Sequence, residues 1–154
     1  MSLAVYPLAE MPQRVGAMLG TSDWVRVDQA RIDGFAHATG DDQWIHLDAK
    51  RAAEGPFKTT IAHGYLTLSL LPVLMTSAFA IDGVGMSVNY GLDRLRFPAP
   101  VPVNSRLRGH FRLLACDAIE GGVQLKIEAT IECEGASKPV CVAEALSRCF
   151  GDVR

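Results

Sequence analysis

The pattern of apolar and polar residues changes character near the middle of the chain. Before residue 85, apolar positions recur at helical spacing or form one long apolar run, whereas four later runs alternate or are rich in β-branched residues. Turn-forming residues separate these four runs, which favours antiparallel neighbours in a meander. The predicted strands cover residues 86–97, 105–118, 122–133 and 139–150.

The first half predicts short helices around a single strand. In chain order, the expected elements are a helix at 7–20, a strand at 24–27, a helix at 29–39 and a helix at 49–54. Asp28 and Asp48 are candidate N-caps because a short acidic side chain can accept from the first free backbone amides. Gly20 and Gly40 are the expected helix stops.

The apolar segment at residues 63–80 predicts the main helix. It is apolar on nearly every side, so we expect it to be buried on nearly every side. Pro72 lacks a backbone donor and should bend or split this helix. Interspersed hydroxyl side chains favour a core helix over a membrane span. The predicted fold class is therefore α+β, with an antiparallel sheet wrapped around a long central helix, in one domain covering residues 1–154.

The composition of the chain limits which binding partners and which cellular compartment we expect. Of 154 residues, 49% are apolar, enough for one substantial core, and a net charge of −2 gives no reason to expect nucleic acid or an anionic membrane. The four cysteines have no metal-binding spacing, which is typical of small buried residues in a reducing compartment. No secretory leader pattern opens the sequence, and we expect a cytoplasmic protein.

Two short segments carry the candidate chemistry, residues 39–46 (TGDDQWIH) and 61–65 (IAHGY). Asp41 stands five residues before His46 and offers an acid/base pair. Gly64 begins the apolar helix, where unpaired backbone amides could hold a developing negative charge without a Cβ in the way. Spacing alone also allows plain structural roles, a loop carboxylate for Asp41 and a core imidazole for His46.

Four other residues are candidates for substrate binding with similar alternatives. His63 could be a structural cap or a pocket wall at the helix start, and the less favoured alternative is an acid/base role. Trp44 could cover a pocket or simply pack, and Asn89 and Tyr90 could line the pocket or only pair across strands. The nearby histidines lack the tight spacing of metal ligands, so no metal site is expected.

Three blocks together resemble the MaoC-like dehydratases, a family that includes (R)-specific enoyl-CoA hydratases and a nodulation protein N-like branch. The blocks are residues 35–48 (FAHATGDDQWIHLD), 57–64 (FKTTIAHG) and 89–101 (NYGLDRLRFPAPV), and the resemblance covers about residues 25–115. It implies a hot-dog fold, a thioester of coenzyme A or acyl carrier protein as substrate with no separate cofactor, and a homodimer or higher oligomer.

The resemblance also implies roles for individual residues. It assigns Asp41 and His46 as the catalytic pair and the Gly64 amide to the thioester oxygen. The implied activity is reversible hydration of a 2-enoyl thioester to a 3-hydroxyacyl thioester, with (R) stereochemistry resting on the resemblance alone. The chain departs from the family at residues 43–44, where members often carry Asn-Pro, and at Pro72, where some carry a serine.

Two alternative functions remain at this point. Hot-dog thioesterases usually carry an acidic residue on or beside the central helix, and residues 64–80 contain none, which argues against a thioesterase. A non-catalytic acyl-thioester-binding protein is disfavoured by the Asp41/His46 pair, but the altered residues 43–44 leave that interpretation open.

Overall fold

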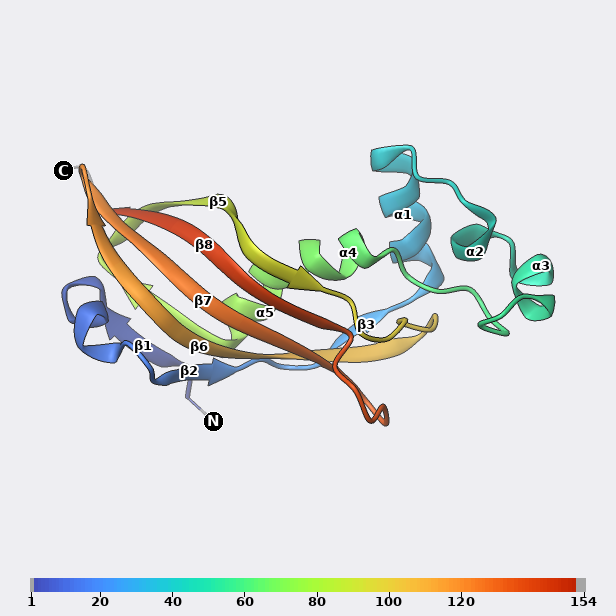
Figure 1. Ribbon diagram of the computed structural model, residues 1–154, viewed down its shortest axis with the longest axis horizontal. Coiled ribbons are helices and arrows are strands. Elements are labelled where there is room, and N and C mark those ends of the chain that lie inside the picture. The colour runs from blue at the N-terminus through green and yellow to red at the C-terminus, as the bar shows by residue number, and fades with distance from the viewer. Residues whose placement is uncertain (1, 152–154) are drawn as a thin grey trace.

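A curved, antiparallel, six-stranded sheet organises the molecule in the computed structural model, which describes residues 2–151. The strand order is β2-β6-β7-β8-β5, and β3 pairs with another part of β6. The strands are β2 (Met18–Thr21), β3 (Val25–Val27), β5 (Val84–Arg96), β6 (Ser105–Ile119), β7 (Gly122–Cys133) and β8 (Cys141–Gly151). The long strands curve around the helix Leu71–Ala78, while the helices of residues 29–54 gather beyond one end of the sheet (Figure 1). This arrangement confirms the predicted α+β hot-dog fold.

The four predicted strands of the second half are confirmed, but their order is only partly the predicted meander. β6, β7 and β8 follow one another as antiparallel neighbours, whereas β5 pairs with β8 and not with β6. The segment between β5 and β6, residues 97–104, contains three prolines. Proline lacks the donor and the conformational freedom for a tight hairpin, so this segment crosses the end of the sheet instead.

Two of the three α-helices before residue 63 begin directly after the predicted N-cap residues. The three helices are α1 (Gln29–Thr39), α2 (Trp44–Leu47) and α3 (Ala49–Glu54), of which α2 lies in a stretch that was expected to be a loop. The Asp28 carboxylate accepts from the amide of the third residue of α1, and Asp48 does the same for α3. Gly40 ends α1 in the left-handed conformation at a φ of 78°, which glycine adopts without strain.

The central helix is split into two helices, as was predicted from the presence of Pro72. α4 (Gly64–Ser69) and α5 (Leu71–Ala78) meet at Leu70, and Pro72 occupies the first turn of α5, where a missing amide hydrogen costs little. The expectation of burial on nearly every side is wrong. Leu74 is fully buried, whereas Tyr65 is 67% exposed and Val73 is 46% exposed, because only one side of the helix pair meets the sheet. None of the helices between residues 2 and 151 is long and apolar enough to cross a membrane.

The N-terminal segment differs most from prediction. Only η1 (Leu8–Arg14) is helical, as a 3₁₀ helix, and Gly20 lies in strand β2 instead of ending a helix. A Cβ on Gly20 would lie 2.2 Å from the Ala78 carbonyl oxygen, so glycine lets β2 cross the end of α5. A parallel pair formed by β1 (Ala4–Pro7) and β4 (Phe79–Asp82) was not predicted from the sequence.

The four cysteines are free and lie in strands β6 to β8. Cys133, Cys141 and Cys149 are buried, and burial raises the pKa of the Cys141 thiol to about 11. A thiol with a raised pKa carries little thiolate at neutral pH and is a poor nucleophile. The cysteines therefore behave as packing residues of the sheet.

Candidate active site

Three polar side chains from different segments meet at the amino end of α4. Asp41 follows α1, His46 lies in α2, and His63 directly precedes α4. The closest nitrogen and carboxylate oxygen atoms of the three side chains all lie within 4.8 Å of one another. His46 is 5% exposed and His63 is 2% exposed, so both imidazoles are almost fully removed from solvent. Asp41 and His46, which were predicted to act as a pair, do lie together.

Two imidazole hydrogen bonds, which we call the cross-tie, join residues 41–46 to residues 61–63. His46 Nδ1 lies 2.7 Å from the Ile61 carbonyl oxygen, and His63 Nε2 lies 2.9 Å from the Asp41 carbonyl oxygen. Each segment thus contributes a ring that donates to the backbone of the other. A backbone bond from the Ile61 amide to the Ile45 carbonyl, 3.0 Å long, supports the same contact.

The cross-tie determines which nitrogen of His46 is free. A carbonyl oxygen can only accept, so Nδ1 carries the proton and Nε2 of the neutral ring keeps its lone pair. Desolvation by burial lowers the pKa of His46 below 6.5, and the charge of His63 adds to this effect. The bond to Ile61 and the charge of Asp41 act in the opposite direction without reversing it. His46 is therefore neutral near pH 7, with Nε2 able to accept a proton.

Side-chain amides around the pair were missed in the sequence analysis. Gln43 Nε2 lies 3.4 Å from the Asp41 carboxylate, so the residue noted as a departure from the family contacts the acid. Gln29 donates to the His46 carbonyl at 2.8 Å and accepts from the Thr60 hydroxyl at 2.7 Å. The Gln29 contacts span 17 and 31 residues of sequence, and no local pattern indicates them.

Gly64 is the first residue of α4, and its surroundings give a second reason for a glycine there. A Cβ at this position would lie 2.9–3.2 Å from three ring carbons of Phe97. The Phe97 ring therefore packs directly on the start of α4, where Tyr65 meets it edge-on at 6.2 Å between ring centroids. A larger residue at position 64 would have to displace this ring, besides any effect on a bound ligand.

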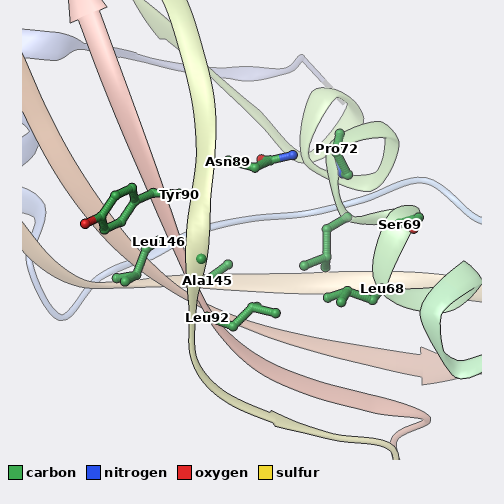
Figure 2. Close-up of a pocket in the computed structure, with 10 residues that line it drawn as sticks. Leu68, Ser69, Pro72, Asn89, Tyr90, Leu92, Ala145 and Leu146 are labelled. Carbon is green, nitrogen blue, oxygen red and sulfur yellow. The ribbon is translucent and has the colours of Figure 1, made fainter.

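Two cavities border the start of the helix pair. One, of about 400 Å³, has walls formed by His46, Gly64, Phe57 and Phe97. The other, of about 390 Å³, lies between the helix pair and strands β5 and β8 (Figure 2). Its lining includes Leu68 from α4, Pro72 from α5, Asn89 and Leu92 from β5, and Ala145 from β8. The first cavity adjoins the polar group, and the second begins one helical turn beyond Gly64.

Asn89 and Tyr90 both border the second cavity but point to opposite sides of β5. The Asn89 side chain reaches toward α5, whereas the Tyr90 ring lies across the strand (Figure 2). The Arg148 guanidinium lies 3.5 Å from the centroid of the Tyr90 ring. The register of β5 against β8 shifts between Asn89 and Gly91, and such a bulge changes the direction of the side chains around it. A substrate-binding role for either residue stays a prediction.

The Trp44 ring packs against α3 and the glycine that follows it. The Arg51 guanidinium lies 4.3 Å from the ring centroid, and a Cβ on Gly55 would lie 3.1 Å from the ring. These contacts fit a packing residue that fixes α2 against α3. Its predicted role as a pocket cover stays untested.

The arrangement of the rings bears on whether the polar group could hold a metal ion. Within residues 2–151, Asp41, His46 and His63 form the group whose possible ligand atoms lie close enough together to bind one metal ion. The two imidazoles, however, are stacked with centroids 3.8 Å apart and planes 25° from parallel. Their lone pairs lie in nearly parallel planes and do not converge on one point, which is unfavourable for a shared ion.

A curved antiparallel sheet around a helix pair, with a carboxylate and an imidazole at the amino end of that pair, defines a hot-dog protein with an acid/base site. The family model described as "MaoC like domain" matches residues 10–133, and the chain belongs to the MaoC-like dehydratase family.

Similar proteins include members with named activities. The chain is 49% identical over 142 residues to 3-hydroxyacyl-thioester dehydratase Z of Mycobacterium tuberculosis, covering 92% of this chain and 94% of that protein. It is 48% identical over 140 residues to nodulation protein N of Rhizobium leguminosarum bv. viciae, covering 88% and 86%. The solved structure of the R-hydratase PhaJ1 from Pseudomonas aeruginosa matches with a TM-score of 0.72 and 25% identity, over 90% of this chain and 83% of that one.

The contact between Gly64 and Phe97 predicts a coupled effect on stability. Gly64→Ala should lower the free energy of unfolding by about 1–3 kcal/mol, because the new methyl group overlaps the Phe97 ring. In a Phe97→Ala background the same change should be neutral or slightly stabilising, since alanine restricts the unfolded chain. Urea unfolding of the four proteins measures the coupling, expected at about 0.5–3 kcal/mol.

Gly91→Ala is the matched control, because a Cβ there meets no atom within 4 Å. It should change the free energy of unfolding by less than about 0.5 kcal/mol. An equal cost of Gly64→Ala with and without the Phe97 ring would contradict the steric explanation.

Proposed function

We propose that this protein catalyses the reversible hydration of a 2-enoyl thioester to a 3-hydroxyacyl thioester, with Asp41 and His46 as the acid/base pair. The observation that carries the proposal is the His46 ring beside Asp41 at the amino end of α4, with its Nδ1 bonded to the Ile61 carbonyl so that Nε2 is left for the substrate. The high identity to a protein named 3-hydroxyacyl-thioester dehydratase Z, over 92% of the chain, supports the reaction class.

In the hydration direction, His46 Nε2 takes a proton from water as the water oxygen bonds to C3 of the substrate. The electron pair of the C2=C3 bond moves toward the thioester oxygen and forms an enolate. The proton then returns to C2, where the enolate electron pair makes the new C–H bond. The Asp41 carboxylate holds the second hydrogen of the water and stabilises the imidazolium that forms transiently. Dehydration runs through the same steps in reverse.

The enolate oxygen needs a donor that is already oriented. The Gly64 amide at the start of α4 is the proposed donor, because amides in a first helical turn have no partner within the helix. Loss of one such donor typically costs about 2.7–4 kcal/mol of activation free energy. The cavity between the helix pair and β5 would take the acyl chain, since its lining is largely apolar and it begins one turn beyond Gly64.

The finer features of the substrate follow from the relatives and from the chemistry. (R) stereochemistry is proposed because the solved R-hydratase structure shares the fold at 25% identity. The thioester is carried by coenzyme A or acyl carrier protein, and the reaction needs no separate cofactor, since His46 supplies both proton transfers with Asp41 as its electrostatic partner.

Asp41→Asn and His46→Ala should each reduce hydration of crotonyl-CoA by at least about a hundredfold, because each removes one group of the pair. The assay follows the loss of enone absorbance together with free thiol, and circular dichroism confirms that the variants are folded. Asp42→Asn and His37→Ala are matched controls, since both residues are exposed near the site, and both should keep near-normal rates.

Three outcomes would overturn this proposal. Thiol release by the wild type would indicate a thioesterase. Neither hydration nor hydrolysis across a series of enoyl-CoA lengths would indicate a binding protein. A near-normal rate in either folded variant of the pair would remove the roles given to Asp41 and His46.

We also propose that two copies of the chain associate through an apolar face formed by β5 and the helix pair. The outer edge of β5 pairs with no strand among residues 2–151, and exposed apolar side chains lie both on β5 and on the helix pair. They are Met86, Val88, Tyr90 and Leu92 on β5, Tyr65 on α4 and Val73 on α5. Exposed apolar side chains that gather on neighbouring elements are typical of interfaces. Three shifts of register in β5 hinder a long ladder with another strand, so side-chain packing would provide the contact.

Val73→Asp should therefore separate the copies, because it places a charge in the middle of this apolar face. Sedimentation should give twice the chain mass of 16.6 kDa for the wild type and the single mass for the variant. Val5→Asp is the control, since Val5 is also exposed, at 59% against 46% for Val73, but lies on β1, and it should leave the mass unchanged. A wild type that sediments as an active monomer would contradict the proposed interface.

A further inference from the structure

His63 contacts both segments that carry the candidate catalytic residues, and the proposed reaction does not require it to move a proton. Its ring stacks on His46 at 3.8 Å and meets the Phe35 ring at 4.8 Å between centroids. Its Nε2 donates to the Asp41 carbonyl at 2.9 Å. The side chain is 2% exposed, so both contacts are held in a closed environment.

A buried imidazole is a costly way to fill this space. His63 Nδ1 is buried and has no hydrogen-bond partner among the described residues. Leaving a buried polar atom unpaired costs free energy, and a phenylalanine would fill a similar volume without that cost. Packing alone therefore does not explain the imidazole, whereas the donor to the Asp41 segment does.

We propose that His63 is a positioning residue of the hydration reaction, which holds the Asp41 backbone and the plane of the His46 ring in the arrangement that catalysis needs. The inference rests on the proposed function. The donor at Nε2 fixes the backbone that carries the Asp41 carboxylate, and the flat face keeps the His46 ring oriented with Nε2 free. A displacement of about 1 Å in either group can cost up to about a hundredfold in rate.

Stacking also has an electrostatic consequence. The titratable groups close to His46 are Asp41 and His63, and His63 helps to lower the pKa of His46. Replacing His63 by phenylalanine keeps a flat apolar face but removes that like-charge interaction. The pKa of His46 should then rise, and the acidic limb of the pH profile of kcat/KM should move to higher pH, because His46 stays protonated over a wider range.

Three variants separate the two contributions. His63→Ala should lower kcat by about 10–100-fold while KM changes less than about threefold, since substrate contacts are intact. His63→Gln keeps an amide donor within reach of the Asp41 carbonyl and should recover at least about fivefold of that loss. His63→Phe should lower kcat and also shift the acidic limb upward.

Leu74→Ala is the control for general loss of packing. Leu74 is fully buried on α5, about three turns beyond His63, and its truncation should destabilise the protein while leaving kcat within about threefold of the wild type. A kcat of His63→Ala within twofold of the wild type would overturn the inference. An equal loss of kcat in Leu74→Ala, or no recovery in His63→Gln, would also overturn it.

Titration of the His46 ring by NMR keeps this inference separate from the proposed function. If the wild type hydrates no enoyl thioester, the proposed function fails, but the positioning of His46 by His63 can still be measured in the folded protein. The His46 ring should titrate below pH 6.5 in the wild type and at higher pH in His63→Phe. Identical titration in the two proteins would overturn the electrostatic part of the inference.

Discussion

The cross-tie between His46 and Ile61 and between His63 and Asp41 is the constraint on which the candidate active site depends. It joins two segments that have no strand or long helix of their own, and it gives each buried carbonyl a partner. The same bonds leave His46 Nε2 free and bring the Asp41 segment beside the start of α4. Without the cross-tie, the two segments would be joined only by the Ile61–Ile45 backbone bond and by Gln29, neither of which holds the imidazole rings in place.

The sheet fixes one side of the cross-tie in space. The Ala62 amide donates to the Val101 carbonyl at 2.8 Å, and the Val103 amide donates to the Thr60 carbonyl at 2.9 Å. The segment before α4 is therefore tied to the proline-rich crossing that leads into β6. A site on short irregular segments can therefore remain ordered, because its backbone is hydrogen-bonded to a segment that continues directly into the rigid sheet.

Patterns within a few residues of sequence predicted the strands of the second half, the caps Asp28 and Asp48, and the break at Pro72, because each depends on local chemistry. The resemblance to a family, more than spacing, brought Asp41, His46 and Gly64 together. The Gln29 bridge and the packing of Phe97 on Gly64 could not be predicted, since their partners are distant in sequence. Gly20 was misinterpreted for the same reason, because its neighbour Ala78 comes from another element.

The measurement that tests this account most directly is the tautomer of His46, read from the ¹⁵N chemical shifts of its imidazole at pH 7 in the unliganded protein. We predict a neutral ring with the proton on Nδ1 and an unprotonated Nε2, as the bond to the Ile61 carbonyl requires. A ring protonated on Nε2 alone, or a doubly protonated imidazolium at this pH, would contradict it, because no lone pair would then face the substrate.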